Sequence, residues 1–169
     1  GDTRQDATVL DIEAFATATG ATYTEGYEHT GYYNNKYIPR AGESGAQTEL
    51  NYLTNYRAVR YSDVLLMAAE AYNRGGIDDG IAQEYLNQVR RRAFGDQDHD
   101  IFLTGTALTD AIWEERKFEL SMEGHRFFDL VRTGQATSII DGFQQGKHEV
   151  FPIPQQEIDI SGLTQNPGY

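Results

Sequence analysis

Several residue types are absent or scarce in this chain, and each absence excludes a class of protein or site. None of the 169 residues is cysteine, so the chain has neither disulfides nor thiolate metal sites. No apolar run approaches the roughly 20 residues that a bilayer-spanning helix needs. Basic residues number 14 against 26 acidic ones, and the net charge of -12 opposes binding to nucleic acid or to an anionic membrane surface. The composition therefore favours an uncharged ligand.

The motifs of common catalytic and metal sites are also missing. The four histidines show no H-x-x-x-H or H-E-x-x-H spacing for zinc, and there is no G-x-S-x-G, Walker or G-x-G-x-x-G sequence. Asp96, Asp98 and Asp100 alternate like the acids of a calcium loop, but Ile101 stands where such a loop needs glycine. We expect no catalytic residues, no cofactor and no metal site, with loosely bound calcium at this loop as the open alternative.

The chain divides into a loop-rich part, residues 1–56, and a helical part of the same domain, residues 57–169. The first part has little periodicity, and its glycines, threonines and asparagines indicate long loops with short strands. Most of the 11 tyrosines lie between Tyr23 and Tyr61. They either pack beneath the loops or form an aromatic binding surface.

Two amphipathic patterns predict a helical hairpin at the start of the second part. The first is a helix that ends at Gly75 and Gly76, with an apolar face of Tyr61, Val64, Leu65, Ala68 and Tyr72. The second helix is capped by Asp78 or Asp79, and its apolar stripe comprises Ile81, Tyr85, Leu86, Val89 and Ala93. Because the turn is short, the pair must be antiparallel, and it resembles a tetratricopeptide-type hairpin.

Further helices follow the hairpin. Thr109 is the expected N-cap of a helix that runs to about Met122, and Gly124 is expected to stop it. A short helix with Phe127, Phe128, Leu130 and Val131 comes next, and Gly134 ends it. The predicted fold class is mainly α, with a tetratricopeptide-like hairpin, further helices, long loops and little strand.

The densest group of charges lies between Glu114 and Gly134. Glu115 and Glu119 share a helix face, with Cβ atoms about 5 to 6 Å apart, which suggests a glycosidase pair as one hypothesis. The neighbouring bases argue against it, because they keep carboxylates ionised where a general acid needs a raised pKa. We instead predict a structural ion network that fixes the helix corner at Gly124, formed by Arg116, Glu119, Arg126, Asp129 and Arg132.

Five motifs in this order resemble the C-terminal portion of the SusD/RagB family. They are R-Y-S-D-V-L-L-M-A-A-E-A-Y-N-R-G-G, Y-L-N-Q-V-R-R-R-A, W-E-E-R-K-F-E-L-S-M-E-G-H-R-F-F-D-L-V-R-T-G, F-P-I-P-Q-Q-E-I and L-T-Q-N-P-G-Y. The opening G-D-T-R-Q-D-A-T and the later G-Y-Y-N-N-K-Y-I are similar to the family more loosely. The resemblance implies that the hairpin is part of the α-α superhelix of the SusD fold and that the chain is a fragment of a longer one.

The resemblance also implies a function. Proteins of this family are non-catalytic lipoproteins of the Bacteroidetes outer membrane that bind glycans or peptides at the cell surface. They work with a SusC-like TonB-dependent transporter, and their lipid anchor would lie outside this chain. If this portion contacts ligand, we expect Tyr27, Tyr32 and Tyr33 to do so. The alternatives are a RagB-like peptide-binding protein, a helical-repeat scaffold for a protein partner, and a glycoside hydrolase that uses the acids at 114–129.

Overall fold

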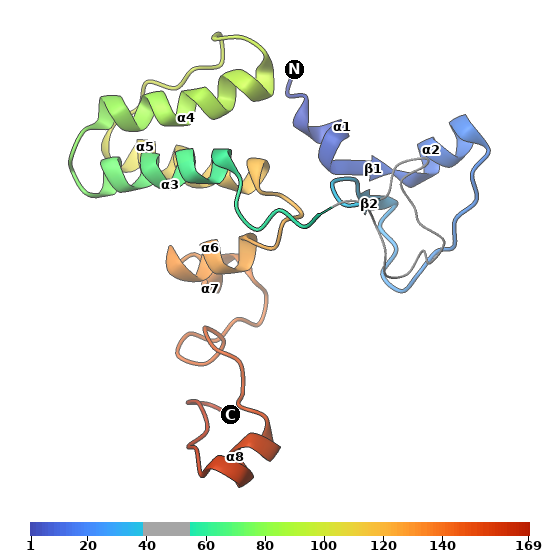
Figure 1. The fold of residues 1–169 in the computed structure, drawn as a ribbon, viewed down its shortest axis with the longest axis vertical. Helices are drawn as coiled ribbons and strands as arrows, with labels where there is room; N and C mark the ends of the chain where they lie inside the picture. The colour runs from blue at the N-terminus through green and yellow to red at the C-terminus, as the bar shows by residue number, and fades with distance from the viewer. Residues whose placement is uncertain (39–54) are drawn as a thin grey trace. The chain divides into compact units, whose positions relative to one another are not determined.

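The computed structural model describes residues 1–38 and 55–169, which form two compact units. The N-terminal unit is Gly1–Glu123 and the C-terminal unit is Gly124–Tyr169. Helix is the main regular secondary structure of the chain, as predicted, and the C-terminal unit has more loop than helix (Figure 1). The division between units therefore falls after Glu123, and part of the predicted loop-rich segment, residues 39–54, lies outside the described residues.

The first residues of the N-terminal unit form two short helices and a small antiparallel ribbon. These elements are α1 (Arg4–Thr8), β1 (Val9–Asp11), α2 (Ile12–Thr19) and β2 (Tyr32–Asn34). Leu10 of β1 is paired with Tyr33 of β2. The carboxylate of Asp11 caps α2 by accepting a hydrogen bond from the amide of Ala14 at 2.9 Å. This region is thus more ordered than the sequence pattern indicated.

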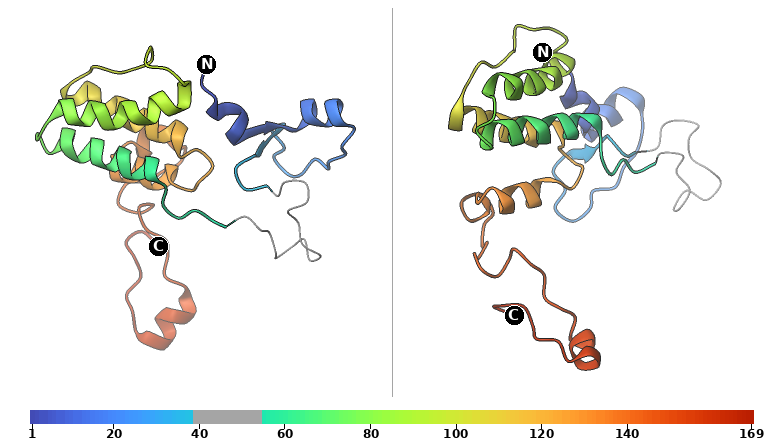
Figure 2. Two further views of the ribbon diagram at one scale, coloured as in Figure 1. Left: turned by 45° about the horizontal axis from the view of Figure 1, so that its top comes forward. Right: turned by 60° about the vertical axis from the view of Figure 1, so that its left-hand side comes forward.

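Three longer helices form the core of the N-terminal unit, namely α3 (Tyr61–Arg74), α4 (Asp79–Phe94) and α5 (Gly105–Glu119). Helices α3 and α4 make the predicted antiparallel hairpin, and α5 lies against both (Figures 1 and 2). Of the two possible caps, Asp78 is the one used, accepting from the amides of Gly80 and Ile81. The buried apolar cluster comprises Leu65, Leu66, Ala69, Ala82, Leu86, Val89, Leu108 and Ile112.

The predicted apolar face of α3 is partly wrong. Leu65 is buried, but Tyr61 and Val64 are 73% and 44% exposed. The side chains that α4 and α5 cover are Leu66 and Ala69, which lie on the neighbouring stripe of the helix. The apolar pattern of α3 is wider than the face that these two helices bury. Periodicity alone therefore predicted burial for part of the helix surface that is exposed.

The predicted start of α5 is also wrong, because the helix begins four residues before Thr109. A contact with another helix fixes its start: the amide of Gly105 donates to the carboxylate of Asp79 at 2.7 Å. The carbonyl of Gly105 accepts from the side chain of Asn73 at 3.0 Å. Thr109 then lies inside the helix, where its hydroxyl donates to Asn73. Partners distant in sequence replace the local cap that the pattern suggested.

The C-terminal unit contains short helices joined by loops. They are α6 (Arg126–Arg132), α7 (Ala136–Ile139) and α8 (Gln155–Ser161). The predicted short helix with the Phe127–Phe128 pair is α6. After α7, the side chain of Gln165 accepts from the amide of Ile153 at 2.7 Å and donates to its carbonyl at 2.8 Å. One amide side chain thus pairs with the backbone of the proline-flanked segment as a neighbouring strand would.

No helix within residues 1–38 and 55–169 has both the length and the apolar character needed to cross a bilayer.

Candidate functional site

The three predicted ligand-binding tyrosines differ in exposure. Tyr27 lies in a turn and is 96% exposed, and Tyr32 on β2 is 57% exposed. Tyr33 follows Tyr32 in the strand, so their side chains point to opposite faces of the ribbon. The rings of Tyr27 and Tyr32 are therefore open to solvent, whereas Tyr33 is turned toward the protein.

Tyr33 belongs to a small aromatic cluster beside the ribbon. Its ring meets Tyr23 edge-on at 6.4 Å between centroids and His29 at 5.8 Å. The Tyr33 hydroxyl donates to the carbonyl of Thr24 at 3.4 Å. These contacts give Tyr33 a packing role that supports the loop carrying Tyr27.

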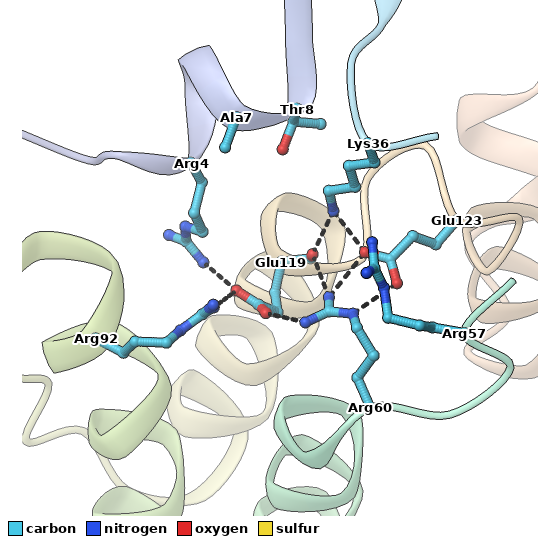
Figure 3. Close-up of a pocket in the computed structure, with 9 residues that line it drawn as sticks. All are labelled: Arg4, Ala7, Thr8, Lys36, Arg57, Arg60, Arg92, Glu119 and Glu123. Carbon is cyan, nitrogen blue, oxygen red and sulfur yellow. Dashed lines mark hydrogen bonds and ion pairs between the residues drawn. The ribbon is translucent and has the colours of Figure 1, made fainter. Parts of the chain in front are cut away.

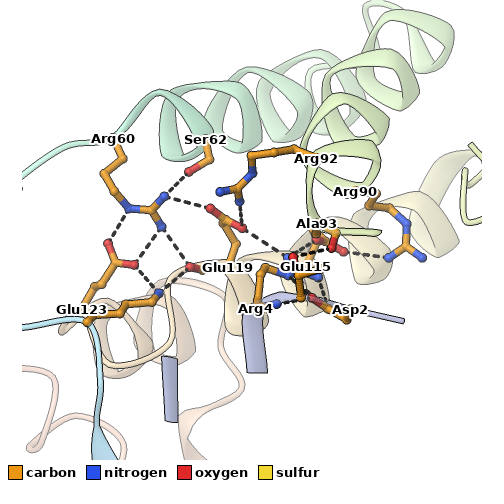
Figure 4. A network of polar contacts seen from close by, with 12 residues as sticks. Asp2, Arg4, Arg60, Ser62, Arg90, Arg92, Ala93, Glu115, Glu119 and Glu123 are labelled. Atoms are coloured by element: carbon orange, nitrogen blue, oxygen red, sulfur yellow. Dashed lines mark hydrogen bonds and ion pairs between the residues drawn. The ribbon is translucent and has the colours of Figure 1, made fainter. Parts of the chain in front are cut away.

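The strongest polar feature of the N-terminal unit is a buried ion network centred on Glu119 (Figure 4). Its carboxylate accepts from Arg60 at 2.9 Å, from Arg4 at 3.3 Å and from Arg92. Glu119 is 2% exposed. Such a carboxylate is stable in the interior because three guanidinium groups replace its hydration.

Glu115 and Glu123 extend this network along the same side of α5 and beyond its end. The two oxygens of Glu115 accept from Arg4 at 2.5 Å and from Arg90 at 2.7 Å. Glu123 accepts from Arg60 at 2.8 Å and from Lys36 at 2.5 Å. The network therefore ties α1, α4 and the segment before α3 to α5.

The pKa values of two of these acids are lowered. Burial by itself would raise the pKa of Glu119, but the hydrogen bond from Arg60 and the charge of Arg92 bring it below its ordinary value. Burial likewise opposes ionisation of Glu123, and bonds from Arg60 and Lys36 lower its pKa. A general acid needs the opposite shift, so the lowered pKa of Glu119 argues against its use as the acid of a glycosidase.

The other members of the predicted network have partners of two kinds. Arg116 donates to Asp63 of α3 at 2.7 Å, and both side chains are buried. In the C-terminal unit, Arg132 and Asp129 form a pair three residues apart on α6, at 2.7 Å. Arg126 begins α6. The idea that these charges fix the corner at Gly124 stays a prediction.

A polar cavity of about 250 Å³ opens beside the network in the N-terminal unit (Figure 3). Its wall is mostly basic, with Glu119 and Glu123 as the acidic members. The lining residues are Arg4, Ala7, Thr8, Lys36, Arg57, Arg60, Arg92, Glu119 and Glu123. Four of these residues belong to the ion network: Arg4, Arg60, Glu119 and Glu123. Arg57 contacts an aromatic ring instead, and its guanidinium carbon lies 5.6 Å from the centroid of Tyr37.

The loop that suggested calcium uses its acids within the protein. Asp96 contacts the ring of His99 at 2.8 Å, and Asp100 pairs with Arg91 at 2.6 Å. In the described part of the chain, no three acidic or histidine side chains gather as a metal site would require.

The sequence pattern did not indicate the basic half of the network. Arg4, Lys36 and Arg60 reach Glu119 or Glu123 from 59 to 115 residues away in sequence. Spacing rules detect partners within one or two helical turns, so they proposed only neighbours of Glu119. No local pattern in the sequence indicates that these three bases are partners of Glu119 or Glu123.

A sequence model of the SusD family matches residues 11–149 of this chain. The SusD-like protein P2 of Formosa agariphila is 31% identical over 154 residues, which cover 82% of this chain and 29% of that protein. The SusD-like protein P38 of the same organism is 34% identical over 131 residues, covering 69% of this chain and 25% of that protein.

Solved structures give the same similarity. A laminarin-binding SusD-like protein superposes with a TM-score of 0.81 at 42% identity, covering 98% of this chain and 35% of that one. A SusD homologue from Bacteroides thetaiotaomicron has a TM-score of 0.73 at 27% identity, covering 99% of this chain and 41% of that one. The chain thus spans roughly a quarter to two fifths of the length of these relatives.

Proposed function

The chain belongs to the SusD family, and on that premise we propose that it takes part in binding a glycan at the cell surface and delivering it to a TonB-dependent transporter. The observation that carries the proposal is the likeness to the laminarin-binding SusD-like protein, at 42% identity over nearly the whole chain. Laminarin is accordingly the first ligand to test.

The exposed tyrosines of the N-terminal unit support a role in glycan binding. A sugar ring presents flat apolar C–H faces and a rim of hydroxyls, so an exposed aromatic ring with its own hydroxyl suits it. Tyr27 and Tyr32 have this character, at 96% and 57% exposure. Tyr33 supports them from within the cluster with Tyr23 and His29.

The protein is proposed to bind its ligand without cleaving it. Glycoside hydrolysis needs one carboxylic acid that keeps its proton near neutral pH. Glu115 and Glu119 are instead held by Arg4, Arg60, Arg90 and Arg92. These hydrogen bonds occupy the carboxylate oxygens that would have to contact a substrate.

The cellular setting follows from the family. We place the protein at the outer membrane, facing outward, with a SusC-like transporter as its partner. Purification from cells in mild detergent tests this part: a SusC-like transporter is expected to copurify in a constant ratio. Recovery of the protein in the periplasmic fraction, without a transporter, would contradict the placement.

A calorimetric panel of laminarin, other glycans and short peptides tests the ligand class. We expect saturable binding to at least one glycan, and a loss of about two- to tenfold in affinity for Tyr27→Ala and for Tyr32→Ala. Tyr61→Ala is the matched control, since Tyr61 is 73% exposed but lies on α3. Unchanged affinities in the first two variants would remove these tyrosines from the site, and binding of peptides alone would replace the glycan with a peptide ligand.

A further inference from the structure

The basic cavity of the N-terminal unit carries more positive charge than its structural role uses. Five of its lining residues are cationic and two are carboxylates, and Arg4 is also paired with Asp2 and Glu115, which do not line the cavity. Those carboxylates are fully engaged: Glu119 accepts from Arg4, Arg60 and Arg92, and Glu123 accepts from Lys36 and Arg60. A cavity of this kind is unexpected in a chain of net charge -12.

Among the cations that line the cavity, Arg57 is the one that forms no ion pair with Glu119 or Glu123. Within residues 1–38 and 55–169, no carboxylate forms an ion pair with Arg57, and the residue is exposed. Its guanidinium lies over the ring of Tyr37 at 5.6 Å, and Tyr37 stacks on Tyr56 with 5.6 Å between centroids. A guanidinium held over a ring face keeps its N–H donors, which lie in its own plane, free for an oxyanion.

Arg92 provides a second set of donors at the cavity wall. One of its terminal nitrogens binds Glu119, while the side chain remains 57% exposed. Both arginines line the same cavity as Lys36, whose ammonium is held by Glu123 and by the carbonyl of Glu119 at 2.9 Å. Arg57 and Arg92 thus place unused N–H donors on the wall of this cavity, which also includes the ammonium of Lys36, and guanidinium donors of this kind suit a carboxylate or a sulfate.

We propose that this cavity binds a single oxyanion group, and that its source is an acidic sugar: a uronate carboxylate or a sulfate ester. At about 250 Å³, the cavity is smaller than most small-molecule sites, which range from about 300 to 1,000 Å³. It therefore receives one charged group of a glycan and not the chain of sugars. This inference rests on the proposed function and adds a charged class of ligand to it.

The overall negative charge of the protein does not oppose such a site strongly. Exposed charges beyond about 8 Å are largely screened at physiological ionic strength. Charges that line the cavity act at hydrogen-bond distance, where a guanidinium and an oxyanion attract far more strongly. Local surplus charge therefore decides binding, while the acidic surface slows the approach of the ligand.

The test is calorimetry and thermal shift with methyl glucuronide and methyl glucoside, which differ at the carboxylate. We expect the glucuronide to bind and raise the melting temperature, and the glucoside to do neither. Arg57→Gln is expected to weaken glucuronide binding by about ten- to hundredfold, and Arg57→Lys by less, because lysine keeps the charge but loses the fork. Arg74→Gln is the control, since Arg74 lies 5.6 Å from the ring of Trp113 but does not line this cavity.

Further arms separate the sources of the anion and the two proposals. Tighter binding of the glucuronide or of galactose 6-sulfate than of inorganic sulfate or acetate supports a sugar-borne group, whereas equal binding of the free ions would overturn that source. Absence of saturable binding, or equal binding by Arg57→Gln, would overturn the site. Laminarin affinity is measured in the same samples. The rest of the glycan panel is measured with it. If a neutral glycan binds while the glucuronide and the sulfates do not, only the oxyanion site is ruled out. If the anions bind and no glycan of the panel does, the proposed function is ruled out.

Discussion

The two units of the chain secure their polar groups by different means. In the N-terminal unit, buried carboxylates bind bases that are distant in sequence, as Glu119 binds Arg4 and Arg60. In the C-terminal unit, polar side chains bind partners closer in sequence: Arg132 binds Asp129 three residues away, and Gln165 binds the backbone of Ile153 twelve residues away. The charge-rich stretch from Glu114 to Gly134 crosses from one unit to the other. Its acids therefore share a spacing pattern without sharing an environment.

The contribution of a charged side chain to the free energy of unfolding therefore depends on how deeply it is buried and not on its spacing in the sequence. Glu114 and Lys117 on α5 form a pair at 2.7 Å, with side chains 52% and 42% exposed. Glu119 on the same helix is buried among three guanidinium groups. Exposed pairs typically contribute about 0 to 1 kcal/mol, while removing one partner of a buried network costs several times more.

The largest effect is expected for Glu119→Ala. The substitution leaves Arg4, Arg60 and Arg92 facing one another without their shared carboxylate. We expect the free energy of unfolding of the N-terminal unit to fall by about 3 to 5 kcal/mol, measured by urea denaturation. A fall of less than about 1 kcal/mol would show that the network does not hold α1 and the segment before α3 to α5.

Acidification is expected to have the next largest effect. The folded pKa values of Glu119 and Glu123 lie below 4.5, so the unfolded chain binds protons more readily than the folded one. Their stabilising contribution is present above about pH 4.5 and is lost as the pH falls through the lowered values. Denaturation at a series of pH values should show this decline, with a shallower slope in Glu119→Gln. Equal slopes in the two proteins would contradict it.

Gln165→Ala probes the C-terminal unit. The variant loses the bonds to the amide and carbonyl of Ile153, and also the bond from the amide of Asn166 at 2.9 Å. We expect a local loss of about 1 to 3 kcal/mol, read as faster hydrogen exchange at the Ile153 amide. Exchange in α3 should not change, and faster exchange there would mean that the two units do not respond separately.

The smallest effect is expected for Lys117→Ala. Its pair with Glu114 is exposed and lies on the same helix as the Glu119 network. The free energy of unfolding should change by less than about 1 kcal/mol, and added salt should reduce the change further. A loss equal to that of Glu119→Ala would remove the distinction between exposed and buried charges on α5.

The sequence predicted the parts of the fold that depend on local pattern. The α3–α4 hairpin, the short helix at Phe127 and Phe128, and the predominance of helix follow from periodicity and glycine stops. The start of α5 could not be predicted, because Asp79 and Asn73 fix it from other helices. The predicted buried stripe of α3 was partly wrong for a similar reason: the apolar pattern of the helix also includes Tyr61 and Val64, and the positions of α4 and α5 decide which part of it is covered.

The candidate site was less predictable than the fold. The pattern identified Glu119 as a structural ion but proposed partners three residues away, whereas Arg60 and Arg4 lie far off in sequence. It gave no indication of the cavity at Arg57, because that cavity exists only once residues 4, 36, 57 and 92 are brought together. Tyr27, Tyr32 and Tyr33 were predicted from the chemistry of tyrosine rings. The structure shows that the first two are exposed and that Tyr33 packs against Tyr23 and His29.

The most direct test of the central claim is to incubate the protein with laminarin and measure binding by calorimetry while the reaction mixture is analysed for shorter products. We expect saturable binding, with the polysaccharide recovered intact. Release of shorter saccharides that disappears in Glu119→Gln would contradict it, because it would make the buried network an active site.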